Sequence, residues 1–138
     1  MRFMIIVKAT KDSEAGVKPP EGLIAEMVTY HEALHKAGML LDASGLHPSS
    51  NGWRIKFSGG KRTVVDGPFA ETKELIGGYT LIKAKSRQEA LEWTKRFPNP
   101  TLDGREYEIE VRQLYELEDC GPREAVERFR EMGVGAEK

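Results

Sequence analysis

Short stretches of the chain either alternate between apolar and polar positions or are apolar throughout, as β-strands do. Residues 2–8 (RFMIIVK) are apolar at odd and even positions alike, which predicts a strand with both faces covered. Three further strands are expected, with the sequences MLLDASGL (39–46), GYTLIKA (78–84) and YEIEVRQL (107–114). The polar residues 9–20 are expected to form a mobile loop.

Residues 53–66 have the pattern of a β-hairpin. Trp53, Ile55 and Phe57 alternate with polar residues, and the following Gly-Gly pair suits a two-residue turn because glycine tolerates positive φ. Four of the polar positions are basic, namely Arg54, Lys56, Lys61 and Arg62. A basic hairpin with interleaved aromatic residues fits either RNA stacking or a solvated face opposite an apolar one, and we favour the solvated face.

Three other segments have helical spacing. Residues 21–37 carry an apolar arc that consists of Leu23, Ile24, Met27, Tyr30 and Leu34. Residues 86–97 begin with Ser86 and, three positions later, Glu89, which is the pattern of a capping box. Residues 122–133 begin with a proline and are expected to turn four side chains inward, those of Ala125, Val126, Phe129 and Met132.

The order of these elements predicts the fold class. Without the hairpin and the last helix the order is βαββαβ, the ferredoxin-like α+β pattern in which both helices cover one face of an antiparallel sheet. We expect one domain over residues 1–138, with a core over about 1–118 and a C-terminal helix over 122–133. The second face of the sheet carries Met4 and Ile6 and needs a cover, so a homodimer is expected.

Composition narrows the classes of function. The 138 residues are 39% apolar and 31% charged with a net charge of -1, so a soluble protein without direct nucleic-acid binding is expected. The first apolar run stops at Lys8, which predicts no membrane contact, no export signal and a cytoplasmic location. Cys120 stands alone, which fits a reducing compartment, and no neighbouring base marks it as reactive.

Residues 64–79, VVDGPFAETKELIGGY, place strong turn chemistry between two expected strands. Asp66 precedes Gly-Pro, so its carboxylate either caps its own turn or faces a cleft as a general acid or base. The residues leave both readings open. In the second reading Pro68 and Phe69 form an apolar lip, and a polar wall consists of Thr72, Lys73 and Glu74.

His31 falls on the apolar arc of the first expected helix and should point at the sheet. A histidine there is either a hydrogen-bonded core residue or a proton carrier with an adjustable pKa. Its neighbour Tyr30 lies at the opposite edge of the arc. His31 and His35 have i, i+4 spacing but read HEALH, which lacks the glutamate of the zinc-peptidase signature, so no metal is expected. The chain has no phosphate-loop motif, and no cofactor is expected.

The run VVDGPFAETKELIGGY resembles the signature of DGPF-domain proteins within the YCII-related family, and the flanking KAGMLLDASGLHPSSNG and KSRQEALEWTKRFP agree with it. The resemblance covers about residues 1–120. It implies a dimeric α+β barrel, in which two ferredoxin-like sheets pack face to face. The positions that match the motif are Asp66, Gly67, Pro68, Phe69, Glu71, Thr72, Lys73, Glu74, Gly77 and Gly78.

The resemblance also implies two classes of function. Smaller members look like enzymes with a His–Asp pair in a cleft, and their histidine corresponds to a position near Met27, one turn before His31. The chain is then a small-molecule enzyme using acid–base chemistry in a dimer-associated cleft, or a regulatory or binding module linked to extracytoplasmic-function sigma factors and transcription. For the enzyme, Asp66 and His31 are the expected catalytic residues and the ligand is small and polar. The expected substrate-binding residues are Tyr30, Pro68, Phe69, Thr72, Lys73, Glu74 and Gly78.

Overall fold

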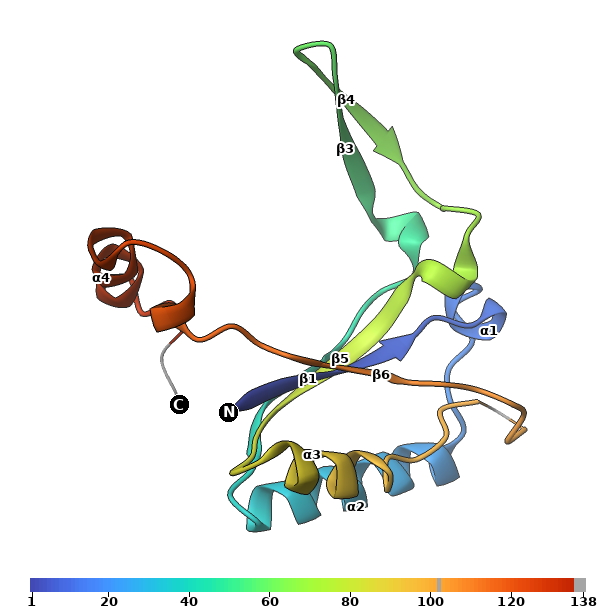
Figure 1. Cartoon of the computed structure of the whole chain (residues 1–138). Helices are drawn as coiled ribbons and strands as arrows, with labels where there is room; N and C mark the ends of the chain where they lie inside the picture. The colour runs from blue at the N-terminus through green and yellow to red at the C-terminus, as the bar shows by residue number, and fades with distance from the viewer. Residues whose placement is uncertain (102, 136–138) are drawn as a thin grey trace.

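The computed structural model describes residues 1–101 and 103–135 (Figure 1). Its longer elements, in chain order, are β1 (Arg2–Lys8), α1 (Lys11–Glu14), α2 (Glu21–Lys36), β2 (Leu40–Gly45), β3 (Trp53–Ser58), β4 (Lys61–Asp66), β5 (Ile76–Lys83), α3 (Arg87–Thr94), β6 (Glu110–Gln113) and α4 (Arg123–Glu131). Short 3₁₀ turns cover Ser49–Asn51, Thr72–Glu74 and Leu117–Asp119. No helix among the described residues is long and apolar enough to cross a membrane.

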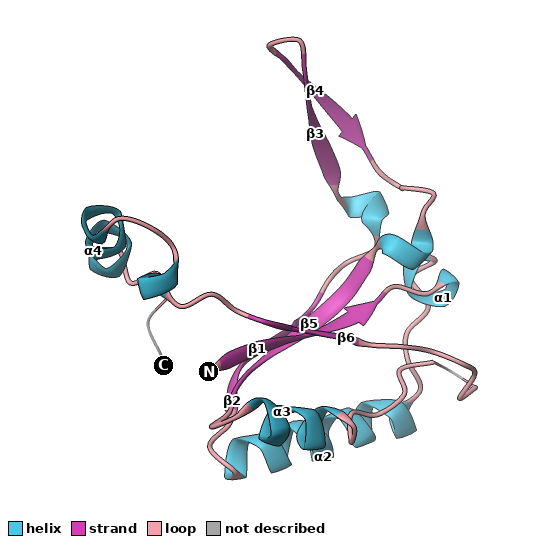
Figure 2. Ribbon diagram, viewed as in Figure 1, coloured by secondary structure: helices cyan, strands magenta, loops and turns pink. Residues whose placement is uncertain are grey.

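Four strands form an antiparallel sheet in the order β2-β5-β1-β6. Helices α2 and α3 lie together on one face of this sheet (Figure 2). This is the ferredoxin-like βαββαβ arrangement, so the expected α+β fold class is confirmed. The pairing of Ile5 with Thr80 and of Phe3 with Ile82 places these four residues in rows that face the helices.

Local sequence explains where several elements begin and turn. The hairpin turn is Gly59-Gly60, with φ of 56° and 77°, which confirms the predicted two-residue turn. Helix α3 begins after Ser86, whose side chain accepts a hydrogen bond from the backbone N–H of Glu89 at 3.1 Å. The Glu89 carboxylate accepts from the backbone of Lys85 and not of Ser86, so only one half of the predicted capping box forms.

The core lies between the sheet and the two helices. Ile5, Leu34 and Ile82 are completely buried, and the remaining buried members of the cluster are Phe3, Tyr30, Met39, Ala84 and Ala90. Burying each large aliphatic side chain contributes about 1.5–3 kcal/mol to folding. This cluster holds α2 against β1 and β5, and so fixes the position of every residue along α2.

Three expectations about local structure are wrong. Residues 9–20 are not a simple loop, because Thr10 and Ser13 form a reciprocal capping box that starts α1. The last strand is shorter than 107–114, since β6 covers only Glu110–Gln113. In α4 only Val126 is buried within the chain, while Ala125, Phe129 and Met132 are exposed.

Two segments extend away from the sheet on the side opposite α2 and α3 (Figure 1). One is the hairpin β3–β4, here called the hairpin arm (residues 53–66), and the other is the C-terminal arm (residues 115–135), which carries α4. The hairpin does not pack on the sheet, since every residue of β3 and β4 is exposed. The sheet face between the arms, here called the open face, carries the half-buried Met4 and Ile6.

Candidate functional site

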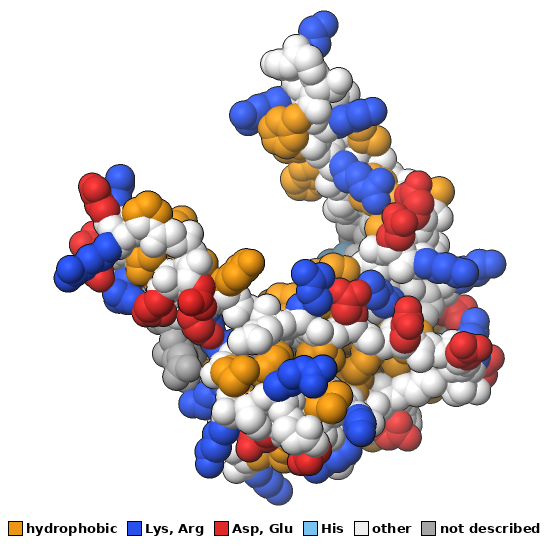
Figure 3. All heavy atoms as spheres, viewed as in Figure 1, with side chains coloured by type: hydrophobic (Ala, Val, Ile, Leu, Met, Phe, Trp, Pro, Cys, Tyr) orange, Lys and Arg blue, Asp and Glu red, His pale blue; other side chains and the backbone are white. Residues whose placement is uncertain are grey.

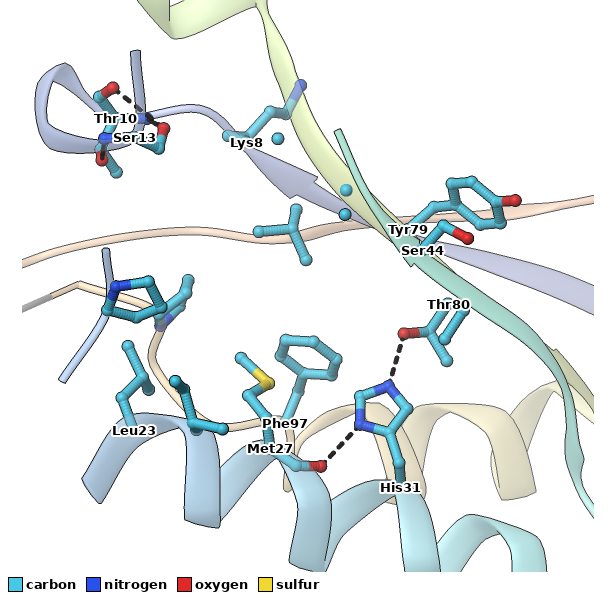
Figure 4. Close-up of a pocket in the computed structure, with 18 of the residues that line it drawn as sticks. Lys8, Thr10, Ser13, Leu23, Met27, His31, Ser44, Tyr79, Thr80 and Phe97 are labelled. Atoms are coloured by element: carbon cyan, nitrogen blue, oxygen red, sulfur yellow. Dashed lines mark hydrogen bonds between the residues drawn. The ribbon is translucent and has the colours of Figure 1, made fainter. Parts of the chain in front are cut away.

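A cavity of about 530 Å³ lies between α2 and the sheet, at the end where β1 finishes and β5 begins (Figure 4). Its wall on α2 is apolar and consists of Leu23, Ile24, Met27 and Val28. Phe97 and Val7 extend this apolar lining from α3's C-terminal side and from β1. The floor is β5, with Gly77, Gly78 and Thr80, and α1 contributes Asp12 and Ser13 at one side. A cavity of this size and character suits a small, largely apolar molecule.

His31 places an imidazole ring at the edge of this cavity, and its two nitrogens have different partners. Nδ1 lies 2.7 Å from the carbonyl oxygen of Met27. A carbonyl only accepts, so Nδ1 carries the hydrogen. Nε2 lies 2.8 Å from Oγ1 of Thr80. In the neutral ring Nε2 is therefore an acceptor, and the threonine hydroxyl donates to it.

The sequence positions this pair through two regular elements. Met27 and His31 are one helical turn apart on α2, so the carbonyl of Met27 lies directly beside the ring. Thr80 belongs to the helix-facing row of β5 and is only 2% exposed. The ring of Phe97 lies 6.2 Å from that of His31 in an edge-on arrangement. Packing and hydrogen bonding together fix the orientation of the imidazole.

Gly78 contributes no side chain to the β5 side of the cavity. A Cβ built on Gly78 would lie 2.9 Å from the carbonyl oxygen of Ser44 on the neighbouring strand β2. A side chain at this position would therefore push β2 and β5 apart. The glycine allows the two strands to approach closely, and it leaves the space above the strand unoccupied.

The charged groups that line the cavity already have partners. The ammonium group of Lys8 lies 3.3 Å from a carboxylate oxygen of Glu110. The carboxylate of Asp12 lies 3.3 Å from the guanidinium group of Arg105. Both pairs are partly exposed, so solvent screening keeps their contribution to stability small. The imidazole–hydroxyl pair is thus the polar group of the lining with the most defined geometry.

Tyr30 does not line this cavity. Its ring is buried in the core, and its hydroxyl donates to the carbonyl oxygen of Trp93 at 2.8 Å. Burial raises the pKa of Tyr30 to about 12, although the nearby Arg96 acts in the opposite direction. The phenol stays protonated and serves as a structural donor between α2 and α3.

Of the residues expected at the site, only His31 and Gly78 line the cavity. Asp66 lies at the end of β4, opposite Trp53 in the hairpin, and is exposed. Nor do the other expected residues of the loop after Asp66 contribute to the lining, namely Pro68, Phe69, Thr72, Lys73 and Glu74. The structure does not bring Asp66 and His31 together within one chain.

The DGPF loop instead packs against the 3₁₀ turn that begins with Ser49. A Cβ on Gly67 would lie only 1.8 Å from the carbonyl oxygen of Ser49, so the position requires glycine. The backbone N–H of Phe69 donates to the Ser49 hydroxyl at 3.0 Å. Ser49 in turn donates to the carboxylate of Glu14, from its backbone N–H at 2.8 Å and from its hydroxyl. Glu14 ends α1, so these contacts tie the loop to the element beside the cavity.

Sequence reasoning missed Thr80 and α1. The strand GYTLIKA shows a hydroxyl in the same alternating row as Ile82, a row that must face the helices. A hydroxyl there needs a partner, and a histidine on the apolar arc of a helix is a natural one. The hydroxyl in this row, together with a histidine on the helical arc, was the sequence signal for a contact between Thr80 and His31. Among the described residues, no group of three or more His, Cys, Asp or Glu side chains could hold a metal ion.

Comparisons with known proteins place the chain in a family. The YCII-related domain matches residues 1–114, and the chain belongs to this family. An uncharacterised protein of Rhizobium meliloti (strain 1021) is 36% identical over 80 residues, which are 58% of this chain and 64% of that protein. This match thus spans slightly less than two thirds of the relative.

One solved structure with a similar arrangement is 5-chloro-2-hydroxyhydroquinone dehydrochlorinase from Burkholderia phenoliruptrix AC1100, in complex with 2,5-dihydroxybenzoquinone. The alignment covers 84% of this chain and 95% of that chain, with 16% sequence identity and a TM-score of 0.42.

Proposed function

We propose that the chain is a small-molecule enzyme in which Nε2 of His31 accepts a proton from a substrate bound in the cavity. The observation that carries this proposal is the hydrogen bond from Nδ1 to the Met27 carbonyl, which leaves Nε2 with its lone pair toward Thr80 and the cavity. When Nε2 takes a proton, the ring becomes an imidazolium that still donates to Met27. The carbonyl stabilises this cation, as an orienting acceptor does for other histidine bases.

The lining defines the class of substrate. Most of the wall is aliphatic or aromatic, and the ion pairs of Lys8 and Asp12 leave neither charge unpaired. The substrate is therefore a small molecule with an apolar body and a hydroxyl or carbonyl group that replaces or joins the contact between Thr80 and His31. This is more apolar than the polar ligand expected from the sequence. Proton abstraction from such a molecule supports isomerisation, dehydration or lyase chemistry.

Asp66 has no part in proton transfer within its own chain under this proposal. It stands outside the cavity, and the loop that follows it is bound to Ser49. Of the two readings of Asp66 that the sequence left open, its position does not favour the one in which the carboxylate faces a cleft of its own chain.

The test begins with a thermal-shift screen of small hydroxylated and carbonyl compounds, followed by turnover assays on the compounds that stabilise the protein. His31→Gln keeps a polar side chain without a basic nitrogen, and we expect it to lower kcat by about 10²–10⁴-fold. The matched controls are Asp66→Asn and His35→Gln, which lie outside the cavity and should retain activity. A crystal structure of the complex should show the compound against α2.

Two outcomes would overturn the proposal. Loss of activity in Asp66→Asn equal to that in His31→Gln would restore the expected Asp–His pair and place it across two chains. The regulatory or binding module would be favoured instead if compounds bind in the cavity but are not turned over, and if His31→Gln leaves their binding unchanged. Co-purification with a sigma factor would then be the next measurement.

A further inference from the structure

In the part of the chain that the structure describes, the two arms expose large apolar side chains. In the hairpin arm Trp53 is 64% exposed and Phe57 is 68% exposed, and in the C-terminal arm Met132 is 68% exposed. An isolated two-stranded hairpin is marginally stable in water, and so is a helix as short as α4. Both arms therefore need a surface to pack against.

Each arm gathers apolar side chains on one side. Strand pairing puts Trp53, Ile55, Phe57 and Val64 on one side of the hairpin, with Arg62 and Asp66 at the two ends of that side, while the other side carries Arg54, Lys56, Lys61 and Val65. On α4, Phe129 and Met132 follow the buried Val126 at three-residue spacing. Each arm thus presents one apolar stripe, and the stripes gather along the hairpin and on α4 in Figure 3.

Both arms stand on the side of the open face, at opposite ends of the sheet (Figure 1). The open face between them carries Met4, Ile6 and Leu81, which are only half-buried. A second copy of this chain offers the same face and the same arms, so the surface is self-complementary.

A two-fold dimer on this face allows two arrangements. The axis must lie in the plane of the interface, and its direction decides whether each hairpin arm meets the partner's hairpin arm or the partner's C-terminal arm. Charge distinguishes them. The hairpin arm has four basic residues and one acidic residue, a net charge of +3, whereas the C-terminal arm has six acidic and three basic residues, a net charge of -3. Like arms would repel and unlike arms attract.

We propose that the chain forms a homodimer with exchanged arms, in which the hairpin arm of each protomer packs against the C-terminal arm of its partner. The apolar stripe with Trp53 and Phe57 meets the stripe with Phe129 and Met132 of the partner, and the open faces meet between them. The dimer expected from the sequence left the contacts of the arms unspecified, and this arrangement specifies them. It does not depend on the proposed catalytic role of His31.

The native Cys120 in the C-terminal arm provides a direct test, because it is exposed and is the chain's single cysteine. Ser58→Cys or Thr63→Cys adds a thiol to the hairpin arm, on the face away from the apolar stripe. With a flexible bismaleimide, either variant should give a cross-linked dimer when Cys120 is present. The matched controls are the same variants combined with Cys120→Ser, and the unchanged chain.

The controls separate the two arrangements. Exchanged arms give no cross-linked dimer when Cys120 is replaced, and none from the unchanged chain. Cross-linking of the hairpin variants in the Cys120→Ser background would show hairpin meeting hairpin and would overturn the proposal. A monomer by light scattering at micromolar concentration would overturn it as well.

Substitution of the stripes gives a second, quantitative test. Phe57→Ser and Met132→Ser should each weaken dimerisation by about 30-fold or more, measured by analytical ultracentrifugation, because buried anchor residues dominate interface energies. Leu91→Ser, which changes an exposed apolar residue on α3, is the control and should leave the dissociation constant unchanged. Dimerisation should also weaken as salt is raised, since screening reduces attraction between unlike arms. Unchanged dimerisation in both stripe variants would contradict the exchange.

Discussion

In the sheet and its two helices, Ile5, Leu34 and Ile82 are completely buried, whereas in the hairpin arm every residue from Trp53 to Ser58 is exposed. Both regions have regular apolar periodicity, and both form the elements that this periodicity predicts. The first region supplies its own partner surfaces through α2 and α3. The second has one apolar stripe and no layer to cover it. Hydrophobic periodicity therefore predicts that a surface will be covered, but it does not tell whether the same chain covers it, which depends on the fold.

The strongest test of this contrast is a pair of isoleucine truncations. Ile82→Ala should lower the free energy of unfolding by about 2–5 kcal/mol at every protein concentration, because it leaves a cavity in a core that cannot collapse fully. Ile55→Ala should change it by less than about 0.5 kcal/mol in the dilute monomer, where Ile55 is already hydrated. Urea denaturation at several protein concentrations measures both. Equal losses in dilute solution would show that the hairpin arm has a core of its own.

The loop after the hairpin should be sensitive to a single methyl group. Gly67→Ala places a Cβ against the carbonyl oxygen of Ser49, and we expect a loss of about 1–3 kcal/mol together with faster hydrogen exchange in α1, to which Ser49 is bound. Gly52→Ala is the matched control, because its Cβ would approach the same carbonyl at 3.5 Å, an ordinary contact. The idea that this loop supports α1 fails if exchange in α1 is unchanged.

Alkaline pH should lower the free energy of unfolding through two tyrosines. Burial raises the pKa of Tyr30 and of Tyr107 to about 12, above the value of about 10 in the unfolded chain. The folded state holds these protons more tightly, so the stabilisation is complete below pH 10 and is lost as the pH rises from 10 to 12. Tyr30→Phe and Tyr107→Phe should each reduce the slope of unfolding free energy against pH.

The smallest expected effect is that of Cys120→Ser. The thiol is exposed and donates to the carbonyl oxygen of Glu116 at 3.2 Å, a contact that a serine hydroxyl can also make. We expect stability within about 0.5 kcal/mol of the unchanged chain, and the same dimerisation in reducing and non-reducing buffer. A covalent dimer that disappears on reduction would give Cys120 a role that the structure does not suggest.

Much of the fold could be predicted because it depends on local signals. The alternation of strand residues, the arc of α2 and the two glycines of the hairpin turn are each visible within a few positions. The inward direction predicted for Phe129 and Met132 was wrong because a helical stripe does not specify which surface it meets. Helix α1 was missed because four residues are too short for periodicity, and its start depends on the Thr10–Ser13 pair.

The candidate site could be predicted only in part, for a related reason. His31 was found because it lies on an apolar arc, but Leu23, Ile24 and Met27 on the same arc line a cavity and are not packed in the core. A hydrophobic pattern does not distinguish a packed wall from the wall of a pocket. The contact of His31 with Thr80 joins residues 49 positions apart, and the contact of Gly67 with Ser49 also depends on tertiary structure. No local pattern contains either contact.

The division of the hairpin arm into an apolar face and a basic face has a consequence for synthesis of the protein. Residues 53–66 leave the ribosome before residues 123–131, and at about 5–20 residues per second the delay is several seconds. During that time the Trp53–Phe57 stripe has no C-terminal arm to meet, from its own chain or from a partner made simultaneously. Arg54, Lys56 and Lys61 on the opposite face keep such hairpins apart by charge repulsion, as gatekeeper residues do beside aggregation-prone strands. The same charges that select the partner arm would thus protect the growing chain from its own copies.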